Sequence, residues 1–236
     1  MHEIIEEIIF ITPKSRYETM ALLVQYYTKQ GHNIMQASAK AESNLRFFCE
    51  DVQNLINYST KENVACLYNS ISNSVANINL NYFIVKEIHS ELKKLSWQVF
   101  EDFCAALMKK CFGASSVDIT QRTADMGLDF KGFIPFKGRL STSPFTYIEL
   151  YGQAKKYLGN VGRGDVDAFT AFANRQKRDN TYPAQLFVFC TTSDFIPSAK
   201  AEIIKNHFVS INGFQIATLV FQETGKAGIE AIREFL

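Results

Sequence analysis

The segment Tyr147–Lys155 constrains the fold most, because polar and apolar or small residues alternate along its nine positions. Successive side chains of a β-strand point to opposite faces of the sheet, so Glu149, Tyr151, Gln153 and Lys155 share one face. A row of polar side chains on a strand that should be internal to its sheet does more than pack. The segment therefore predicts a sheet strand whose polar face carries a function.

Residues 95–236 alternate helical and strand patterns with turn residues between them, which predicts an α/β domain. Ser96 is a suitable N-cap for a helix that stops at Gly113. Further helices are predicted at Asp165–Lys177, at Ser198–Asn206 and near the C-terminus. Strands are predicted at Val117–Gln121, Leu128–Ile134, Tyr147–Lys155, Leu186–Thr191 and Phe214–Val220.

Residues 1–94 have a different pattern, in which apolar side chains recur with the 3.6-residue period of a helix. Breaks are predicted at Thr12-Pro13, at Gly31–Asn33 and at Asn57–Glu62. Nine Lys and Arg stand against ten Asp and Glu, so this half lacks the basic footprint of a module that grips DNA alone. We expect a mostly helical region for recognition, partner binding or dimerisation.

The bulk composition predicts a globular protein of the cytoplasm that does not enter a membrane. No run of about 18 apolar residues is present, and the first residues are acidic where a signal peptide is basic. The cysteines are odd in number and form no C-x-x-C pair, which argues against a disulfide framework or a structural zinc site. They are Cys49, Cys66, Cys104, Cys111 and Cys190.

Positive charge is concentrated between Lys131 and Arg178, where nine basic residues against three acidic ones give a net charge of +6. The whole chain carries only +1. Such a stripe attracts the phosphate backbone of a nucleic acid, although a solvated face has the same appearance. The Gly-rich turn 159–164 lies within this stretch, and its Arg163 is suited to hold a phosphate bidentately.

Three carboxylates stand where a metal site is conceivable. Glu101 falls on the apolar face of the predicted helix from Ser96, where it needs a partner unless it reaches water at the edge of that face. Asp125 and Asp129 form an Asp-x-Gly-x-Asp segment that leads into a predicted strand. Carboxylates at a strand edge suit Mg²⁺, but Asp-Gly segments are also ordinary turns.

Several ordered blocks of the sequence resemble the catalytic domain of Mrr-type restriction endonucleases, a family of the PD-(D/E)xK nuclease superfamily. The resemblance covers about residues 95–225 and implies the mixed central sheet of that fold, flanked by helices. Its blocks are Trp97–Phe103, Asp125–Asp129, Gln153–Tyr157, Val161–Phe169, Leu186–Phe195, Ala199–Ala201 and Ile211–Gly213 with Leu219.

The resemblance implies a role for each matching residue. Asp129 and the backbone carbonyl of Ala154 would hold a metal ion, Mg²⁺ or Mn²⁺ in its place, with Glu101 helping to bind or orient it. Gln153 stands where most of the superfamily has a second acidic residue. Lys155 would be the catalytic lysine, and its amine is placed to polarise a water beside a scissile phosphate.

Two departures from the family pattern leave alternatives open. The connection Pro135–Phe145 is longer than in the compact pattern, and its Lys137 and Arg139 either contact DNA or belong to a solvated insertion. The acid-to-amide replacement at position 153 leaves open a one-metal mechanism or weak activity. Lys156 is expected to contact DNA with Arg163, and Asp125 matches a further acidic position of the family.

The expected function is Mg²⁺-dependent hydrolysis of phosphodiester bonds in double-stranded DNA, as a restriction or antiviral defence nuclease, with modified DNA as a candidate target. Cutting both strands needs two active sites, so we expect a homodimer or a larger assembly. Three alternatives stay open. They are a DNA repair or junction nuclease, an effector activated by a partner or ligand through residues 1–94, and a non-catalytic nucleic-acid-binding module.

Overall fold

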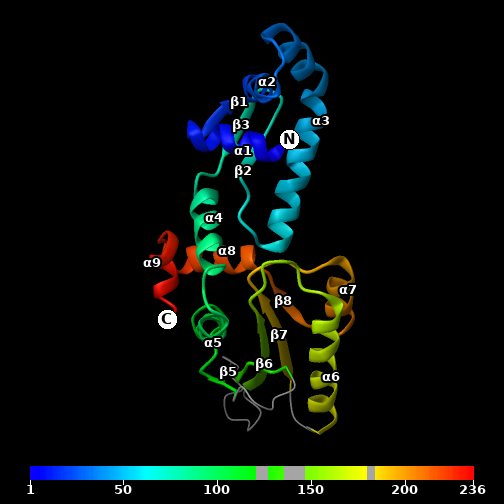
Figure 1. Cartoon of the computed structure of the whole chain (residues 1–236), viewed down its shortest axis with the longest axis vertical. Coiled ribbons are helices and arrows are strands. Elements are labelled where there is room, and N and C mark those ends of the chain that lie inside the picture. Colours follow the sequence, from blue (N-terminus) through cyan, green and yellow to red (C-terminus); the bar gives the residue numbers. More distant parts are fainter. Residues whose placement is uncertain (121–126, 136–146, 180–183) are drawn as a thin grey trace, which may run out of the picture. The chain divides into compact units, whose positions relative to one another are not determined.

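The computed structural model describes residues 1–120, 127–135, 147–179 and 184–236 (Figure 1). The chain divides into two compact units, Met1–Lys86 and Glu87–Leu236, with the division inside helix α4 (Asn81–Leu92). The expected division between residues 94 and 95, and the role expected for the first part, stay predictions. Among the described residues, no helix is both long and apolar enough to span a membrane.

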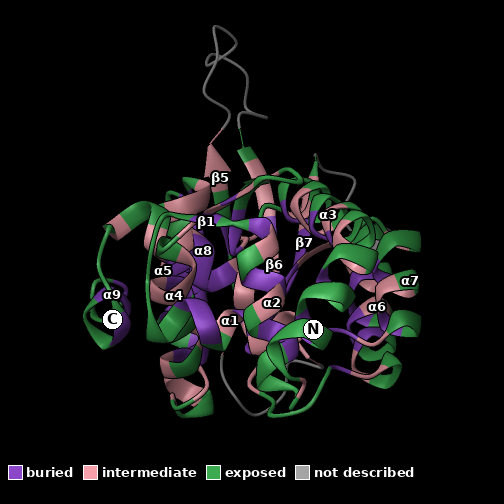
Figure 2. Cartoon of the chain, turned by 90° about the horizontal axis from the view of Figure 1, so that it is seen from above, coloured by how far each residue is buried: buried purple, intermediate pink, exposed green. Residues whose placement is uncertain are grey.

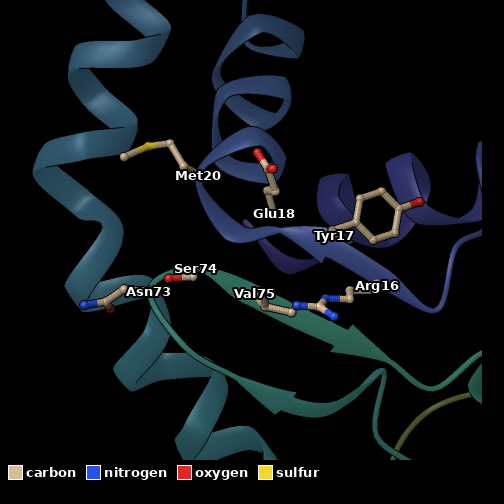
Figure 3. Close-up of a pocket in the computed structure, with 7 residues that line it drawn as sticks. All are labelled: Arg16, Tyr17, Glu18, Met20, Asn73, Ser74 and Val75. Atoms are coloured by element: carbon tan, nitrogen blue, oxygen red, sulfur yellow. The ribbon is translucent and has the colours of Figure 1, made fainter.

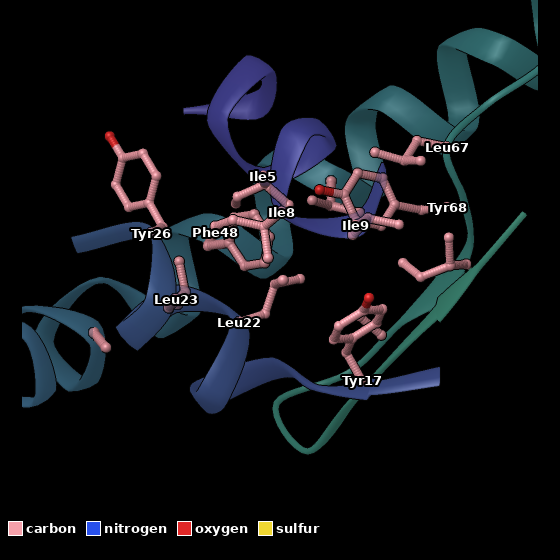
Figure 4. Close-up of a cluster of buried hydrophobic side chains, with 14 of the residues drawn as sticks. Ile5, Ile8, Ile9, Tyr17, Leu22, Leu23, Tyr26, Phe48, Leu67 and Tyr68 are labelled. Atoms are coloured by element: carbon pink, nitrogen blue, oxygen red, sulfur yellow. The ribbon is translucent and has the colours of Figure 1, made fainter. Parts of the chain in front are cut away.

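The N-terminal unit is mostly helical, as predicted, and also contains a small antiparallel sheet that the sequence pattern did not predict. The strands are ordered β1-β3-β2. Figure 4 shows the core, in which apolar side chains of all three helices and of the sheet meet. The elements are α1 (His2–Ile11), β1 (Arg16–Glu18), α2 (Thr19–Lys29), α3 (Ile34–Glu62), β2 (Tyr68–Ile71) and β3 (Val75–Ile78).

Helix α3 begins and ends with standard capping chemistry. Asn33 accepts a hydrogen bond from the backbone N–H of Gln36, whose side chain returns one to the Asn33 N–H. The helix ends at Asn63, a residue that tolerates its left-handed conformation. The break predicted over 57–62 is therefore wrong, because these residues continue the helix, with Ser59 buried and the others at exposed or half-buried positions.

The C-terminal unit contains a five-stranded sheet in the order β4-β5-β6-β7-β8. Strands β4, β5 and β6 pair antiparallel, while β6, β7 and β8 pair parallel, so the predicted mixed α/β sheet is confirmed. The remaining elements are α5 (Trp97–Phe112), β4 (Ser116–Ile119), β5 (Phe130–Pro135), β6 (Tyr147–Lys155), α6 (Arg163–Asp179), β7 (Gln185–Thr191), α7 (Pro197–Lys205), β8 (Val209–Ile211), α8 (Gly213–Thr224) and α9 (Gly228–Arg233).

Helices cover both faces of this sheet. Phe187 and Phe189 of β7 pack on one face in an aromatic cluster with α6 and α7. Figure 1 shows the two helices on this side of the sheet. Tyr151 of β6 stacks on Phe187 from the same face, with ring centroids 5.5 Å apart. The alternate residue Cys190 faces α5, where its thiol is hydrogen-bonded to the thiol of Cys104, and both cysteines are free. The buried residues of this core are purple in Figure 2.

The strand predicted at Phe214–Val220 is wrong, because this segment lies within helix α8. Asn212 caps the helix through the backbone N–H of Gln215, in a second capping box. The β-branched and aromatic residues of segment 214–220 favour a strand locally, but packing against the rest of the unit makes the segment helical. The fifth strand is the shorter segment β8, which precedes this helix.

Gly152 of β6 is required by the packing of its neighbour. Phe130 of β5 is paired with Gly152, and its ring lies flat against this position. A Cβ at Gly152 would lie 1.9 Å from two ring carbons, where no side chain fits. The glycine thus lets a fully buried phenylalanine sit beside the end of β6.

We expect Gly152→Ala to destabilise the protein by about 1 to 3 kcal/mol, because the added methyl overpacks the core. Urea unfolding would measure the change. Gly164→Ala is the matched control, since a Cβ there meets no atom within 4 Å and the residue lies in helix α6. Equal unfolding midpoints for the two variants would contradict the packing argument.

Candidate active site

The site forms where β5 begins and β6 continues past it. Asp129 directly precedes Phe130, the first residue of β5. Its backbone N–H donates to the carbonyl of Gly152 at 2.9 Å. The Asp129 Oδ2 then accepts the backbone N–H of Ala154 at 2.7 Å. Backbone groups alternate sides along a strand, so the Ala154 carbonyl points toward the same side as its N–H. Asp129 therefore takes the place of a strand partner for the end of β6.

Gln153 is the most unusual residue of the site. Its side chain is only 2% exposed, and its Oε1 has no hydrogen-bond partner among the described residues. Its Nε2 lies against Gly127, whose φ of +96° and lack of a side chain both suit the close approach. A buried polar atom without a partner costs folding free energy, and in native proteins it often marks a place for a ligand.

Opposing effects act on the pKa of Asp129. Burial raises the pKa of its carboxyl group, while the hydrogen bond from Ala154 and the positive charge of Lys155 act in the opposite direction. Lys155 is the last residue of β6 and is partly exposed. A half-buried carboxylate and an ammonium group thus stand within electrostatic reach of each other at the open end of two strands.

Glu101 lies on α5, the helix that packs against β5 and β6. It is buried, as its position on the apolar face predicted, with 8% of its surface exposed. One turn later, the thiol of Cys104 has a raised pKa, caused first by burial and then by its hydrogen bond with Cys190, with smaller contributions from the charges of Asp129 and Glu101. The negative charges of Glu101 and Asp129 therefore both raise the pKa of one buried thiol, which lies between the helix and the sheet.

The other predicted residues that the structure describes are more exposed than Gln153 and Glu101. Lys156 follows the site directly and is half-buried, while Arg163 is exposed at the start of α6. The guanidinium of Arg163 pairs with Asp167 at 3.5 Å and with Glu202 at 3.3 Å. Three predicted residues lie outside the described part of the chain: Asp125, Lys137 and Arg139.

Sequence reasoning missed a group of buried hydroxyl residues beside the site. Thr191 and Thr192 are fully buried, and both bond to the backbone carbonyl of Lys155. They entered the sequence argument only as part of the block Leu186–Phe195 and, for Thr191, as the end of a predicted strand. Nothing in their local pattern separates them from a strand end, because the interaction joins residues 36 positions apart.

The N-terminal unit has a pocket of its own, of about 610 Å³, beside β1 and the turn between β2 and β3 (Figure 3). It contains none of the predicted site residues. Most of its lining side chains are exposed, and its polar groups belong to a hairpin turn and an edge strand. The lining residues are Arg16, Tyr17, Glu18, Met20, Asn73, Ser74 and Val75.

Comparison with known proteins places the chain in a family. Residues 92–220 match the restriction endonuclease family Mrr_cat. The chain belongs to this family. The Mrr_cat match contains all of α5 and the strands β5, β6 and β7, so the four candidate residues Glu101, Asp129, Gln153 and Lys155 lie inside it. No curated protein matches the chain in sequence.

Two solved structures are similar to this Mrr_cat chain. One is the MspJI restriction endonuclease in complex with a 27-mer oligonucleotide, at 22% identity and a TM-score of 0.46. The other is the DNA modification-dependent restriction endonuclease AspBHI, at 16% identity and a TM-score of 0.45. Each comparison covers 66% of this chain, but only 35% of the MspJI chain and 38% of the AspBHI chain.

The donors of the site are suited to a hard cation. In the described part of the chain, no group of three His, Cys, Asp or Glu side chains is close enough to hold a metal. The Mrr_cat site offers a different set of donors: the Asp129 carboxylate, the Ala154 carbonyl and the Gln153 Oε1, which has no hydrogen-bond partner among the residues that the structure describes. All three are oxygen atoms, the ligand type that Mg²⁺ takes.

We expect Asp129→Asn to be more stable than the wild type when no metal is added. Because the pKa of Asp129 is raised in the folded state, its charge opposes folding above that pKa. The advantage of the variant should be full above the raised pKa and disappear below the unfolded-state pKa. Urea unfolding as a function of pH would measure it.

Asp102→Asn is the control for this prediction, because Asp102 is exposed on the solvent side of the same helix as Glu101. Its stability should follow the wild type across the pH range. If Asp129→Asn is less stable than the wild type at neutral pH, the carboxylate stabilises the fold and the electrostatic argument is wrong.

Proposed function

We propose that the chain is a metal-dependent endonuclease that hydrolyses phosphodiester bonds of double-stranded DNA, as a restriction or antiviral defence nuclease of the cytoplasm. The observation that carries the proposal is the buried Gln153 Oε1, on the strand that also carries Lys155, because this atom has no hydrogen-bond partner within the described part of the chain. A structural glutamine would satisfy this atom. A ligand-binding glutamine holds it ready for a cation.

Asp129, the Ala154 carbonyl and Gln153 would hold Mg²⁺, or Mn²⁺ in its place, with Glu101 binding or orienting it from the opposite face. When bound, such an ion offsets the negative charge that develops on the phosphate and on the leaving oxygen. The Ala154 N–H keeps one oxygen of Asp129 oriented, so that the other is available to the cation.

Lys155 would act on the attacking water and on the phosphate. Its ammonium group lies within electrostatic reach of the Asp129 carboxylate, one of the proposed metal-binding groups. From there it polarises or positions a water molecule for attack on phosphorus. Lys156, Arg163, Lys137 and Arg139 are proposed to contact the DNA backbone, and Arg163 would exchange a carboxylate partner for a phosphate.

Cleavage of both strands needs a second active site, so we propose that the protein works as a homodimer or a larger oligomer. The first 94 residues are proposed to recognise the DNA, to dimerise, or to receive an activating partner or ligand. A modified base is the proposed mark of foreign DNA, while a repair or junction nuclease would act regardless of modification. Asp125 remains a candidate acidic residue of this site.

Plasmid cleavage in Mg²⁺ or Mn²⁺ tests the proposed activity. We expect Asp129→Asn and Lys155→Ala each to lower the cleavage rate by about 100-fold or more, because each removes a group acting at the reacting phosphate. Lys109→Ala is the matched control, since Lys109 is an exposed lysine of α5 outside the site. Methylated and unmethylated plasmids distinguish restriction of modified DNA from the other roles.

A second candidate function is non-catalytic DNA binding on a nuclease fold, which the amide at position 153 favours because it lowers the negative charge of the site. In that case the wild type would shift DNA in a gel without cutting it. Equal cleavage by the wild type and by Lys155→Ala would instead show a nuclease whose active site lies elsewhere.

Metal binding has its own readout. We expect Mg²⁺ to raise the thermal midpoint of the wild type, because a ligand that binds only the folded state stabilises it. Asp129→Asn should show a much smaller rise, since it lacks the charged donor. An equal rise in both proteins would place the bound cation outside this site.

A further inference from the structure

The backbone carbonyl of Lys155 receives two hydrogen bonds from the segment that follows β7. Thr191 donates its Oγ1–H at 2.8 Å, and Thr192 donates its backbone N–H at 3.3 Å. Both threonines are fully buried. Lys155 is the last residue of β6, and β5 no longer pairs with β6 at this point. These two bonds therefore hold a strand end that has only one neighbouring strand.

The same segment also holds the chain beyond Lys155. Thr192 Oγ1 accepts the backbone N–H of Tyr157 at 3.2 Å and donates to the Tyr157 carbonyl at 3.0 Å. Thr191 and Thr192 thus bind the backbone on both sides of Lys156. We call this pair of residues the threonine clamp.

The threonine clamp is itself anchored from α4 and α8. The Nε2–H of His89 donates to the Thr192 carbonyl at 3.0 Å. Gly213 leaves room for this bond, since a Cβ there would lie 2.2 Å from the Thr192 oxygen and 2.6 Å from His89 Nε2. Ser193 completes the group, because its backbone N–H bonds Thr191 Oγ1 at 3.2 Å.

We infer that Thr191 and Thr192 are positioning residues, which set the direction of the Lys155 side chain through its backbone. The inference rests on the proposed function, in which Lys155 acts on the reacting phosphate. A side chain at a strand end keeps its direction only if the backbone there is fixed. A reacting group displaced by about 1 Å loses about 100-fold in rate.

Packing alone does not explain these hydroxyl groups. Valine has nearly the shape of threonine and suits a buried strand end without the need to satisfy a polar atom. The chain instead places three hydroxyl residues in succession, Thr191, Thr192 and Ser193, all of them buried. Two of the three hydroxyl groups bond directly to the backbone of the segment that begins at Lys155.

The test compares Thr191→Val and Thr192→Val with Thr191→Ser and Thr192→Ser in the full chain. Each would be assayed for kcat and KM on plasmid DNA, for DNA affinity in chelator, and for thermal midpoint. Thr218→Val is the matched control, because Thr218 is buried and its Oγ1 also donates to a backbone carbonyl, that of Phe214.

We expect the valine variants to lose about 10- to 100-fold in kcat, with DNA affinity unchanged and thermal midpoints lowered about as much as in Thr218→Val. The serine variants, which keep the hydroxyl group, should recover most of the kcat. Thr218→Val should keep the wild-type kcat. If a valine variant does not fold, two variants of His89 replace it in the test. His89→Leu removes the hydrogen bond to the Thr192 carbonyl, while His89→Gln keeps a donor. Only the leucine variant should lose kcat.

The outcomes separate the two proposals. If the wild type cuts DNA and the valine and leucine variants cut equally well, the positioning inference fails while the proposed function stands. A kcat loss in Thr218→Val as large as in the clamp variants would also overturn the inference, because any lost hydroxyl would then have the same effect. If the wild type never cuts in either metal, the proposed function fails and the inference fails with it.

Discussion

The hydrogen bond from the Ala154 N–H to the Asp129 carboxylate is the interaction on which the rest of the site depends. Asp129 lies just before the first residue of β5, and its charged side chain takes the place of a strand partner for the end of β6. The carboxylate is thereby held next to the end of β6, where Gln153 and Lys155 point to the functional face. Without it, this end of β6 would be bonded on one side only, to β7.

This arrangement works against stability at several points. A half-buried carboxylate has a raised pKa, and a buried amide oxygen has no partner among the described residues. Both features cost folding free energy. The aromatic cluster on one face of the sheet offsets this cost, since Phe169, Phe187 and Phe189 are buried in mutual contact. Such local conflicts are expected where a site serves function.

The sequence predicted the long, regular elements well. The helix from Ser96 to Gly113 and the strand Tyr147–Lys155 were predicted correctly, because caps and periodicity act over many residues. The N-terminal sheet was missed, since strands of three or four residues show too few alternations to be recognised. Segment 214–220 was assigned as a strand, although its cap Asn212 indicates the helix that forms.

The sequence by itself determined which residue types are available and where periodicity puts them: the polar face of β6, the buried side of Glu101 and the family resemblance that the comparison confirms. Only the tertiary structure decided which groups meet. Register places Asp129 at the Ala154 N–H, and sheet order brings Thr191 to the carbonyl of Lys155. These contacts join residues 25 and 36 positions apart, and local patterns carry no record of such distant pairing.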